Sequence, residues 1–179
     1  MLPTTIDELF DLYRARGATE YLGEAVTQLE HAAQCAALAA ADGASDALVL
    51  AAFLHDVGHL LVDNNVGGTD DRHERSGAAL IARLLGEEVA APVRLHVAAK
   101  RYLCGAEPGY LARLSPTSIA SLHAQGGPFD ADEGARFLAA PFAEDALLLR
   151  RWDDLGKAHG AAELDLEAMR RLAQRRARG

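Results

Sequence analysis

The sequence predicts an all-α fold, and three observations support this prediction. Alanine and leucine, both strong helix formers, are abundant along the whole chain. Apolar residues recur at steps of three and four positions, which is the period of one face of a helix. No stretch alternates apolar and polar residues as an exposed strand would. The 179 residues suffice for a buried core and contain no linker or repeat, so we expect a single domain over residues 1–179.

Ten helices are expected, each ending where turn-forming residues interrupt the helical period. In the first half, residues 62–72 contain two asparagines and two glycines with little apolar content, which predicts a loop and a candidate lid. In the second half, Gly126, Gly127 and Pro128 stop a helix, because glycine accepts positive φ and proline cannot continue a helix. The predicted helices cover residues 5–14, 19–41, 45–61, 73–85, 87–103, 108–114, 116–125, 130–138, 142–159 and 165–178.

Charge and hydropathy argue against several classes of protein. The 18 basic and 26 acidic residues give a net charge of −8, so the chain has no overall basic field to hold a nucleic-acid backbone. The longest strictly apolar run, residues 47–54, is shorter than the roughly 20 residues that cross a bilayer. The N-terminus lacks a basic-then-apolar signal pattern. We therefore expect a cytoplasmic protein with neither a nucleic-acid nor a membrane partner.

Two features are expected to be structural only. Cys35 and Cys104 are too few for a disulfide framework and lie among apolar residues, so we expect buried, reduced thiols. The arginines of the last predicted helix suit its C-terminal dipole and are expected to form a solvated face.

A histidine and an aspartate, His55 and Asp56, directly follow the apolar run of residues 47–54. A buried helix would carry both polar side chains into a dry interior, where burial without partners is costly. A metal ion removes this cost, because imidazole and carboxylate both bind iron, zinc or manganese, and a carboxylate can bridge two ions. A lone histidine is equally well explained as an ordinary core or surface residue, but the adjacent pair favours a metal site. Other helices of a bundle could complete a two-metal site with His31, His73, His96 and Asp153.

Cationic and hydroxyl side chains accompany these candidate ligands at helical spacing. Lys100 follows His96 by one turn, which places a cation beside a candidate ligand. Arg150 and Lys157 flank Asp153 in the same way. Polar residues at this spacing most often form a solvated face, but stripes that share a helix with a candidate ligand indicate an anion site. Two more polar lines have helical spacing: Ser118, Ser121 and Gln125, and Tyr21, Glu24, Gln28 and His31.

The chain contains the ordered set His31, His55-Asp56, His73, His96 and Asp153. In this set it resembles the HD-domain superfamily, whose members hold one or two metals in a helical core. Most HD proteins are phosphohydrolases, and a smaller branch uses two irons and dioxygen. Three segments resemble the phosphonate-cleaving HD oxygenases, a mixed-valent di-iron family: residues 96–103, 118–128 and 150–157. The segment 118–128 is the most discriminating. The resemblance implies an HD-domain helical bundle with a dinuclear metal centre in its core.

The resemblance also implies a role for each candidate site residue. One iron would be held by His31, His55 and Asp153 and the other by His73 and His96, with Asp56 bridging them. The phosphonate group would be contacted by Lys100, Ser118, Ser121, Gln125 and Arg150. Tyr21 would occupy the open site of one iron before substrate arrives, Glu24 would hold a substrate amino group, and His59 would contact substrate or bound oxygen.

The implied activity is oxidative cleavage of a carbon–phosphorus bond. Two iron ions in the mixed-valent Fe(II)/Fe(III) state, with dioxygen as co-substrate, would convert a 1-hydroxyphosphonate such as 2-amino-1-hydroxyethylphosphonate into glycine, or a related carboxylate, and phosphate. A metal-dependent HD phosphohydrolase acting on a small phosphoester or nucleotide would use the same residues. A non-catalytic sensor or binding module is a third reading, which the full set of ligands disfavours. The substituent on substrate C2 (primary amine, trimethylammonium or none) and the oligomeric state stay open.

Overall fold

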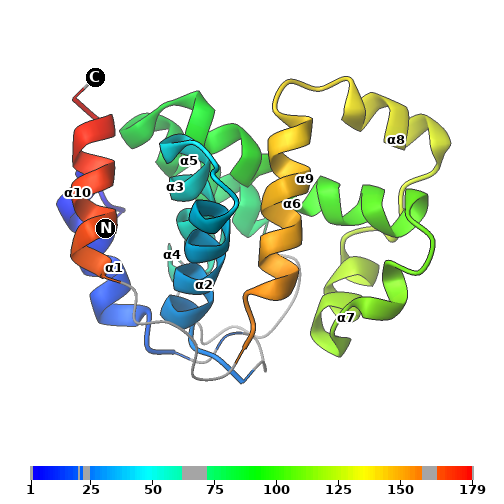
Figure 1. Cartoon of the computed structure of the whole chain (residues 1–179), viewed down its shortest axis with the longest axis horizontal. Coiled ribbons are helices and arrows are strands. Elements are labelled where there is room, and N and C mark those ends of the chain that lie inside the picture. Colours follow the sequence, from blue (N-terminus) through cyan, green and yellow to red (C-terminus); the bar gives the residue numbers. More distant parts are fainter. Residues whose placement is uncertain (1, 20, 22–24, 62–71, 159–164, 179) are drawn as a thin grey trace.

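A computed structural model describes residues 2–19, 21, 25–61, 72–158 and 165–178. Over these residues the chain forms ten α-helices, one short 3-10 helix and no β-strand, which confirms the all-α fold (Figure 1). None of these helices is long and apolar enough to cross a membrane. The elements are α1 (Ile6–Arg16), α2 (Gln28–Ala41), α3 (Asp46–Leu54), α4 (Val57–Leu61), α5 (His73–Leu85), α6 (Glu87–Ala106), η1 (Leu111–Arg113), α7 (Pro116–Ala124), α8 (Ala131–Leu138), α9 (Ala143–Leu155) and α10 (Leu166–Arg176).

Helix α3 forms the centre of the bundle. All of its residues from Ala47 to Leu54 are buried, as expected for a helix that is apolar on every side. Helices α2, α6, α9 and α10 pack on α3, while α5 packs on α6 and α1 packs on α10. Figure 1 shows α1 and α10 at one end of the molecule and α7 and α8 at the other. Polar side chains that α2, α6 and α9 carry inward therefore meet beside α3.

Helix α2 begins at Gln28, so the prediction of one helix over residues 19–41 is wrong for its first turns. The Thr27 side chain accepts from the Glu30 backbone, and the Glu30 carboxylate accepts from the Thr27 backbone at 2.7 Å. This capping box, with Thr27 as the N-cap, determines where the helix begins, even though apolar residues at helical spacing also precede it. Tyr21 lies ahead of the helix, where its backbone N–H donates to the Val26 carbonyl at 2.9 Å. The predicted helical line that begins at Tyr21 is therefore wrong.

The predicted helix over residues 45–61 is divided at His55 and Asp56. Helix α3 ends at Leu54 and α4 begins at Val57. Nδ1 of His55 is hydrogen-bonded to the Ala52 carbonyl oxygen at 2.9 Å. In a continuous helix, that carbonyl would instead accept a backbone N–H. The histidine and the aspartate consequently lie in a break between two helices.

Helix α9 ends at Leu155, four residues before the predicted end at 159. The Gly156 backbone N–H donates to the Trp152 carbonyl at 2.8 Å and closes the last turn. Gln34 of α2 holds the residues that follow, because its amide donates to the Ala158 carbonyl at 2.8 Å and accepts from the Ala158 N–H at 2.9 Å. Residues 156–158, here called the 156–158 segment, are thereby fixed against α2.

The other predictions agree with the structure to within a few residues, with one exception. Helix α5 spans His73–Leu85, as predicted. The helix expected over residues 108–114 is wrong, because only η1 forms there and Gly109 has a φ of +79°, outside helical geometry. The loop expected at 62–72 lies outside the described residues except for Arg72, which precedes α5 in a left-handed conformation.

Some arginines of α10 make ion pairs with other helices. Arg170 pairs with Asp7 of α1 at 2.8 Å, and Arg176 pairs with Glu88 of α6. Arg171 and Arg175 are exposed, in agreement with the expected solvated face. Exposed ion pairs contribute at most about 1 kcal/mol each, so α10 is held mainly by its apolar side.

Candidate metal centre

Six polar side chains from five parts of the fold meet in the interior, and none is more than 9% exposed. They come from the first turn of α2, the break between α3 and α4, the start of α5, the middle of α6 and the end of α9: His31, His55-Asp56, His73, His96 and Asp153. The structure thus brings together all six residues that the sequence predicts as metal ligands.

The Asp56 carboxylate lies between two pairs of histidines. Its Oδ2 is 3.4 Å from Nε2 of His55 and 3.9 Å from Nε2 of His31. Its Oδ1 is 3.3 Å from Nε2 of His73 and 3.6 Å from Nε2 of His96. The two Nε2 atoms are 3.2 Å apart in the first pair and 3.3 Å apart in the second. One carboxylate oxygen therefore faces each pair, which is the arrangement expected of a carboxylate that bridges two metal ions.

Asp153 adds a second carboxylate to only one of the two pairs. Its Oδ1 is 3.4 Å from Nε2 of His31, and its Oδ2 is 3.9 Å from Nε2 of His55. Oδ1 is buried and accepts no hydrogen bond from the described residues, which is unfavourable unless a cation takes its lone pair. Imidazoles and carboxylates together suit iron, zinc or manganese. The donor set therefore fits two metal ions.

Backbone carbonyls orient three of the four imidazole rings. An imidazole that donates its Nδ1–H to a carbonyl presents the lone pair of Nε2, which is the nitrogen that faces the cluster in each case. The backbone thereby selects the tautomer that can bind a metal. The three contacts are from His31 Nδ1 to the Gly156 oxygen (2.8 Å), from His55 Nδ1 to the Ala52 oxygen (2.9 Å) and from His96 Nδ1 to the Val93 oxygen (2.7 Å).

The charges in the cluster keep both carboxylates ionised, while burial of His55 is outweighed by Asp56, which raises the pKa of that ring. Burial alone would raise the pKa of Asp56, but the neighbouring histidines, His55 first, hold it well below its ordinary value. Burial of Asp153 is likewise outweighed, chiefly by Arg150, so its pKa is also well below the ordinary value. Burial lowers the pKa of His96 to about 3 and keeps its ring neutral. Two ionised carboxylates and a neutral imidazole are ready to act as ligands.

Tyr21 contacts the cluster through both its hydroxyl and its ring. The hydroxyl donates to Oδ2 of Asp56 at 2.6 Å, and the ring stacks on His31 with the centroids 4.0 Å apart. Burial, followed by the charge of Asp56, holds the pKa of Tyr21 well above its ordinary value. The phenol therefore remains protonated and donates to the carboxylate that lies between the histidine pairs.

The structure describes one of the two other residues with predicted catalytic roles. His59 of α4 is half-buried and stacks on His73 with the ring centroids 3.9 Å apart. Ligand atoms of His59, His73 and Asp56 lie within 4.8 Å of one another. Glu24 lies outside the described residues.

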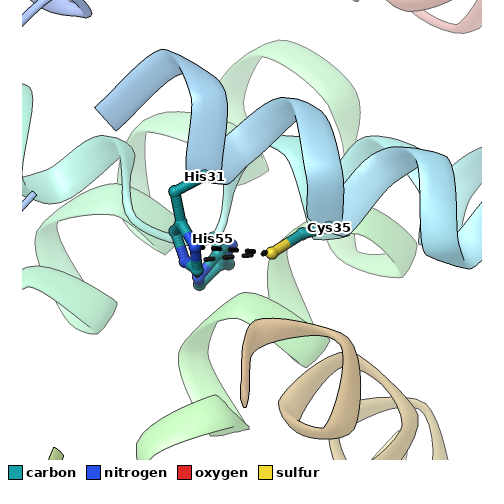
Figure 2. A group of neighbouring side chains, drawn as sticks. All are labelled: His31, Cys35 and His55. Carbon is teal, nitrogen blue, oxygen red and sulfur yellow. Dashed lines mark hydrogen bonds between the residues drawn. The ribbon is translucent and has the colours of Figure 1, made fainter. Parts of the chain in front are cut away.

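Cys35, for which the sequence predicts only a buried thiol, lies beside the cluster (Figure 2). It follows His31 by one turn of α2, and its Sγ is 3.8 Å from Nε2 and 3.9 Å from Nδ1 of His31. The thiol donates to the Trp152 carbonyl at 3.5 Å, and burial holds its pKa well above the ordinary value. Cys35 is thus a neutral group that packs against the imidazole. The four-residue spacing to His31 is the pattern that could have indicated this contact.

Two lysines reach helix α7 next to the cluster. Lys100 of α6, which is buried, donates to Oγ of Ser121 at 2.7 Å. Lys157 of the 156–158 segment donates to Oγ of Ser118 at 3.1 Å, and its Nζ lies 5.8 Å from the centre of the Tyr21 ring. Because Tyr21 is hydrogen-bonded to the Asp56 carboxylate, Lys157 and the α7 residue that it contacts lie beside the cluster, and Lys100 reaches the same helix from one turn beyond His96.

Helix α7 and Lys100 together offer hydrogen bonds and a positive charge. Gln125 follows the last turn of α7, and its Oε1 is buried and accepts no hydrogen bond from the described residues. Burial, followed by the charge of Arg150, lowers the pKa of Lys100 to about 8, so the amine is cationic at neutral pH. We call Lys100, Ser118, Ser121 and Gln125 the α7 polar group. Its chemistry suits an anion with several oxygens.

Arg150 is buried beside Asp153, and each of its three side-chain nitrogens donates to a protein group. Nη1 donates to Oδ2 of Asp153 at 2.6 Å, Nη2 donates to Oδ1 of Asp154, and Nε donates to the Tyr110 hydroxyl at 3.3 Å. The structure also separates the two adjacent aspartates. Asp153 faces the histidines, as predicted from the sequence, whereas Asp154 faces Arg150 and Tyr110.

Comparison with known proteins gives three relatives that match most of the chain, although no protein-family model matches it. The [1-hydroxy-2-(trimethylamino)ethyl]phosphonate dioxygenase (glycine-betaine-forming) of Leisingera caerulea is 41% identical over 150 residues, which are 82% of this chain and 76% of that protein. The hydroxymethylphosphonate dioxygenase of Gimesia maris is 42% identical over 167 residues, which are 90% and 83% of the two chains. An uncharacterized protein of Acanthamoeba polyphaga mimivirus, L432, is 34% identical over 173 residues, which are 93% and 79%.

Sequence and structure agree on the relationship. The two dioxygenases are similar to this chain over at least three quarters of their own lengths. A helical bundle whose interior gathers histidines and aspartates fits the HD-domain fold that the sequence predicts. The protein is an oxygenase, and it belongs to the family of the phosphonate dioxygenases.

Proposed function

We propose that the cluster holds two iron ions, one bound by His31, His55 and Asp153 and the other by His73 and His96, with Asp56 bridging them. The observation that carries this proposal is the position of the Asp56 carboxylate, which turns one oxygen toward each histidine pair at 3.3 to 3.9 Å. The buried Oδ1 of Asp153, which accepts no hydrogen bond from any described residue, supports the first ion in particular.

The proposed reaction is the oxidative cleavage of a carbon–phosphorus bond. One ferrous and one ferric ion would supply dioxygen binding and redox chemistry, which the reaction needs because carbon is a poor leaving group when hydroxide attacks phosphorus. A 1-hydroxyphosphonate and one dioxygen then give one carboxylate and one phosphate, with all atoms accounted for. The residues of this chain bind and orient the substrate and neutralise its charge.

The names of the relatives support a hydroxyl group on the substrate carbon that bears phosphorus. Both named substrates carry that hydroxyl, whereas one has a trimethylammonium group on C2 and the other has no C2. For this chain we propose a 1-hydroxyphosphonate such as 2-amino-1-hydroxyethylphosphonate, which would give glycine and phosphate. Glu24 would pair with the substrate ammonium.

The α7 polar group is the proposed phosphonate subsite, and Arg150 adds a second cation next to it. Lys100 and the Ser121 hydroxyl are already in hydrogen-bond contact, so a phosphonate oxygen that meets both would replace one short contact by two. Tyr21, whose hydroxyl donates to Asp56 in the structure, would be displaced when the substrate enters the centre. His59, stacked on His73, would contact the bound substrate or oxygen.

Oxygen consumption is the measurement that tests this function. Three 1-hydroxyphosphonates are tested: one with an amine on C2, one with a trimethylammonium group on C2, and hydroxymethylphosphonate, which has no C2. With one of them, the iron-loaded protein should consume one dioxygen for each phosphate released. The corresponding phosphonate without the hydroxyl is the control and should release no phosphate. Release of phosphate from a phosphoester without oxygen consumption would instead identify a phosphohydrolase.

Replacing Lys100 by alanine should weaken phosphonate binding by about 1.5 to 3 kcal/mol, because a charge-assisted hydrogen bond shielded from water is lost. Steady-state kinetics should show this loss mainly in KM. Arg94→Ala is the matched control, since Arg94 lies on the same helix but is exposed and paired with Glu87. An unchanged KM in the Lys100 variant would place the phosphonate elsewhere.

The pKa of Lys100 predicts that the KM depends on pH. The pKa of about 8 means that the amine is charged below pH 8 and becomes neutral as the pH rises through this value. The KM of the wild type should therefore increase above pH 8. In Lys100→Ala the KM should already be high at pH 7, and it should lack this rise because the titrating amine is absent. Titration of the substrate affects both proteins equally and so does not contribute to the difference between them. Parallel pH profiles would show that Lys100 is not the titrating group.

A further inference from the structure

Arg150, Tyr110 and Asp154 form a closed cycle of hydrogen bonds, here called the Arg150 network. Arg150 Nε donates to the Tyr110 hydroxyl at 3.3 Å, and the same hydroxyl donates to Oδ2 of Asp154. The other oxygen of Asp154 accepts from Nη2 of Arg150. Tyr110 is 3% exposed and Arg150 is 4% exposed, so little water competes for these bonds. The network therefore restricts the guanidinium to one orientation.

Tyr110 is suited to close this cycle. Burial raises its pKa above the ordinary value, so the hydroxyl keeps its proton and can donate and accept at the same time. Tyr110 lies in the connection between α6 and η1, whereas Arg150 and Asp154 both lie on α9. Packing with Leu103 and Leu114 holds the tyrosine ring in place. The network thus uses one element to fix the position of a side chain on another.

The remaining guanidinium nitrogen acts on Asp153. Nη1 donates to Oδ2 of Asp153 at 2.6 Å, which occupies this oxygen. Oδ1 has no hydrogen bond from the described residues and lies 3.4 Å from Nε2 of His31. A carboxylate held in this way offers only one oxygen to a metal ion, in a fixed direction.

We propose that Tyr110 and Asp154 are positioning residues for the metal ion on Asp153: they hold the Arg150 guanidinium on Oδ2, so that Oδ1 alone binds the metal. The inference rests on the assignment of Asp153 as a ligand in the proposed function. Within the described part of the chain, the side-chain hydrogen bonds of both residues join them to each other and to Arg150, so they act through Arg150.

Metal affinity tests the proposal without any substrate. Ferrous iron is added under anaerobic conditions in competition with a chromophoric chelator. Tyr110→Phe and Asp154→Asn should each weaken one of two bound irons about tenfold and leave the other unchanged, since partners that orient a ligand typically contribute 10- to 100-fold to metal affinity. Glu107→Gln is the control, because Glu107 pairs with Arg113 and Arg151 nearby and is not part of the network. It should bind both irons as the wild type does.

The decisive comparison is made in a protein that lacks Arg150. Added to Arg150→Ala, the Tyr110→Phe change should have no further effect on iron affinity, because the group through which it acts is gone. An equal loss in both backgrounds, or unchanged affinity in both single variants, would overturn the inference. If Tyr110→Phe does not fold, as judged by thermal unfolding, Asp154→Asn provides the same test from a less buried position. A wild-type protein that binds no iron would instead refute the proposed function.

Discussion

Asp56→Asn should remove both metal ions and abolish oxygenase activity. The amide presents one oxygen where two are needed, and it lacks the negative charge that the two histidine pairs share. Groups that merely orient a ligand contribute about 10- to 100-fold to metal affinity, so losing a ligand common to both ions should cost more than about 100-fold. Metal analysis of the purified variant, together with oxygen consumption, measures both effects.

The matched control for this change lies on the preceding helix. Asp46→Asn makes the same substitution at an exposed position in the first turn of α3, where only a weak interaction with the helix dipole is lost. It should retain two metals and nearly full activity. If Asp56→Asn also retained two metals per chain, the bridging role would be wrong.

Gly58→Ala should displace His73 and release the metal on the second histidine pair. A Cβ at Gly58 would lie 2.1 Å from the His73 carbonyl oxygen and 2.7 Å from its carbon. These are backbone atoms, which cannot rotate away as a side chain can, so α4 and α5 would have to separate. Overpacking typically destabilises a fold by about 1 to 3 kcal/mol, and contact with backbone on both helices favours the upper end of this range. Urea unfolding measures the stability, and the ratio of metal to protein measures the site.

A second glycine separates damage to the fold from damage to the site. Gly105 of α6 also lies against backbone, because a Cβ there would lie 2.2 Å from the Phe129 carbonyl oxygen, although its next contact would be at 3.3 Å. Gly105→Ala should therefore also lose stability. However, it should keep both metals, because Gly105 lies nine residues, or about two and a half helical turns, beyond His96 on α6. Retention of two metals by Gly58→Ala as well would show that the packing at α4 does not position His73.

The sequence predicts which residues meet in the interior because their types and spacing carry that information. An apolar run that ends in His55-Asp56 has to bury two polar groups, and buried polar groups need partners. The start of α5 at His73 is likewise predicted. In each case a local pattern of few residues determines the outcome, so no knowledge of the tertiary structure is needed.

Local periodicity cannot predict contacts between residues that are distant along the chain. Tyr110 and Arg150 are 40 positions apart, and nothing in either segment indicates that they are bonded. The prediction of a helix at Tyr21 is wrong for a different reason. Apolar spacing extends through residues 19–41, but the capping box at Thr27 determines where the backbone becomes helical. The orientation of the Asp56 carboxylate between the two histidine pairs also depends on the tertiary structure and cannot be predicted from a local pattern.

The 156–158 segment joins the proposed metal centre to the proposed phosphonate subsite. The carbonyl of Gly156 accepts from the His31 ring, and the next residue, Lys157, donates to Ser118 of the α7 polar group. In the proposed function, a phosphonate that draws Lys157 toward itself would act on the Gly156 carbonyl one peptide away, and through it on the His31 imidazole. Because linkage is reciprocal, occupancy of the metal centre would then change the affinity for the anion by the same factor.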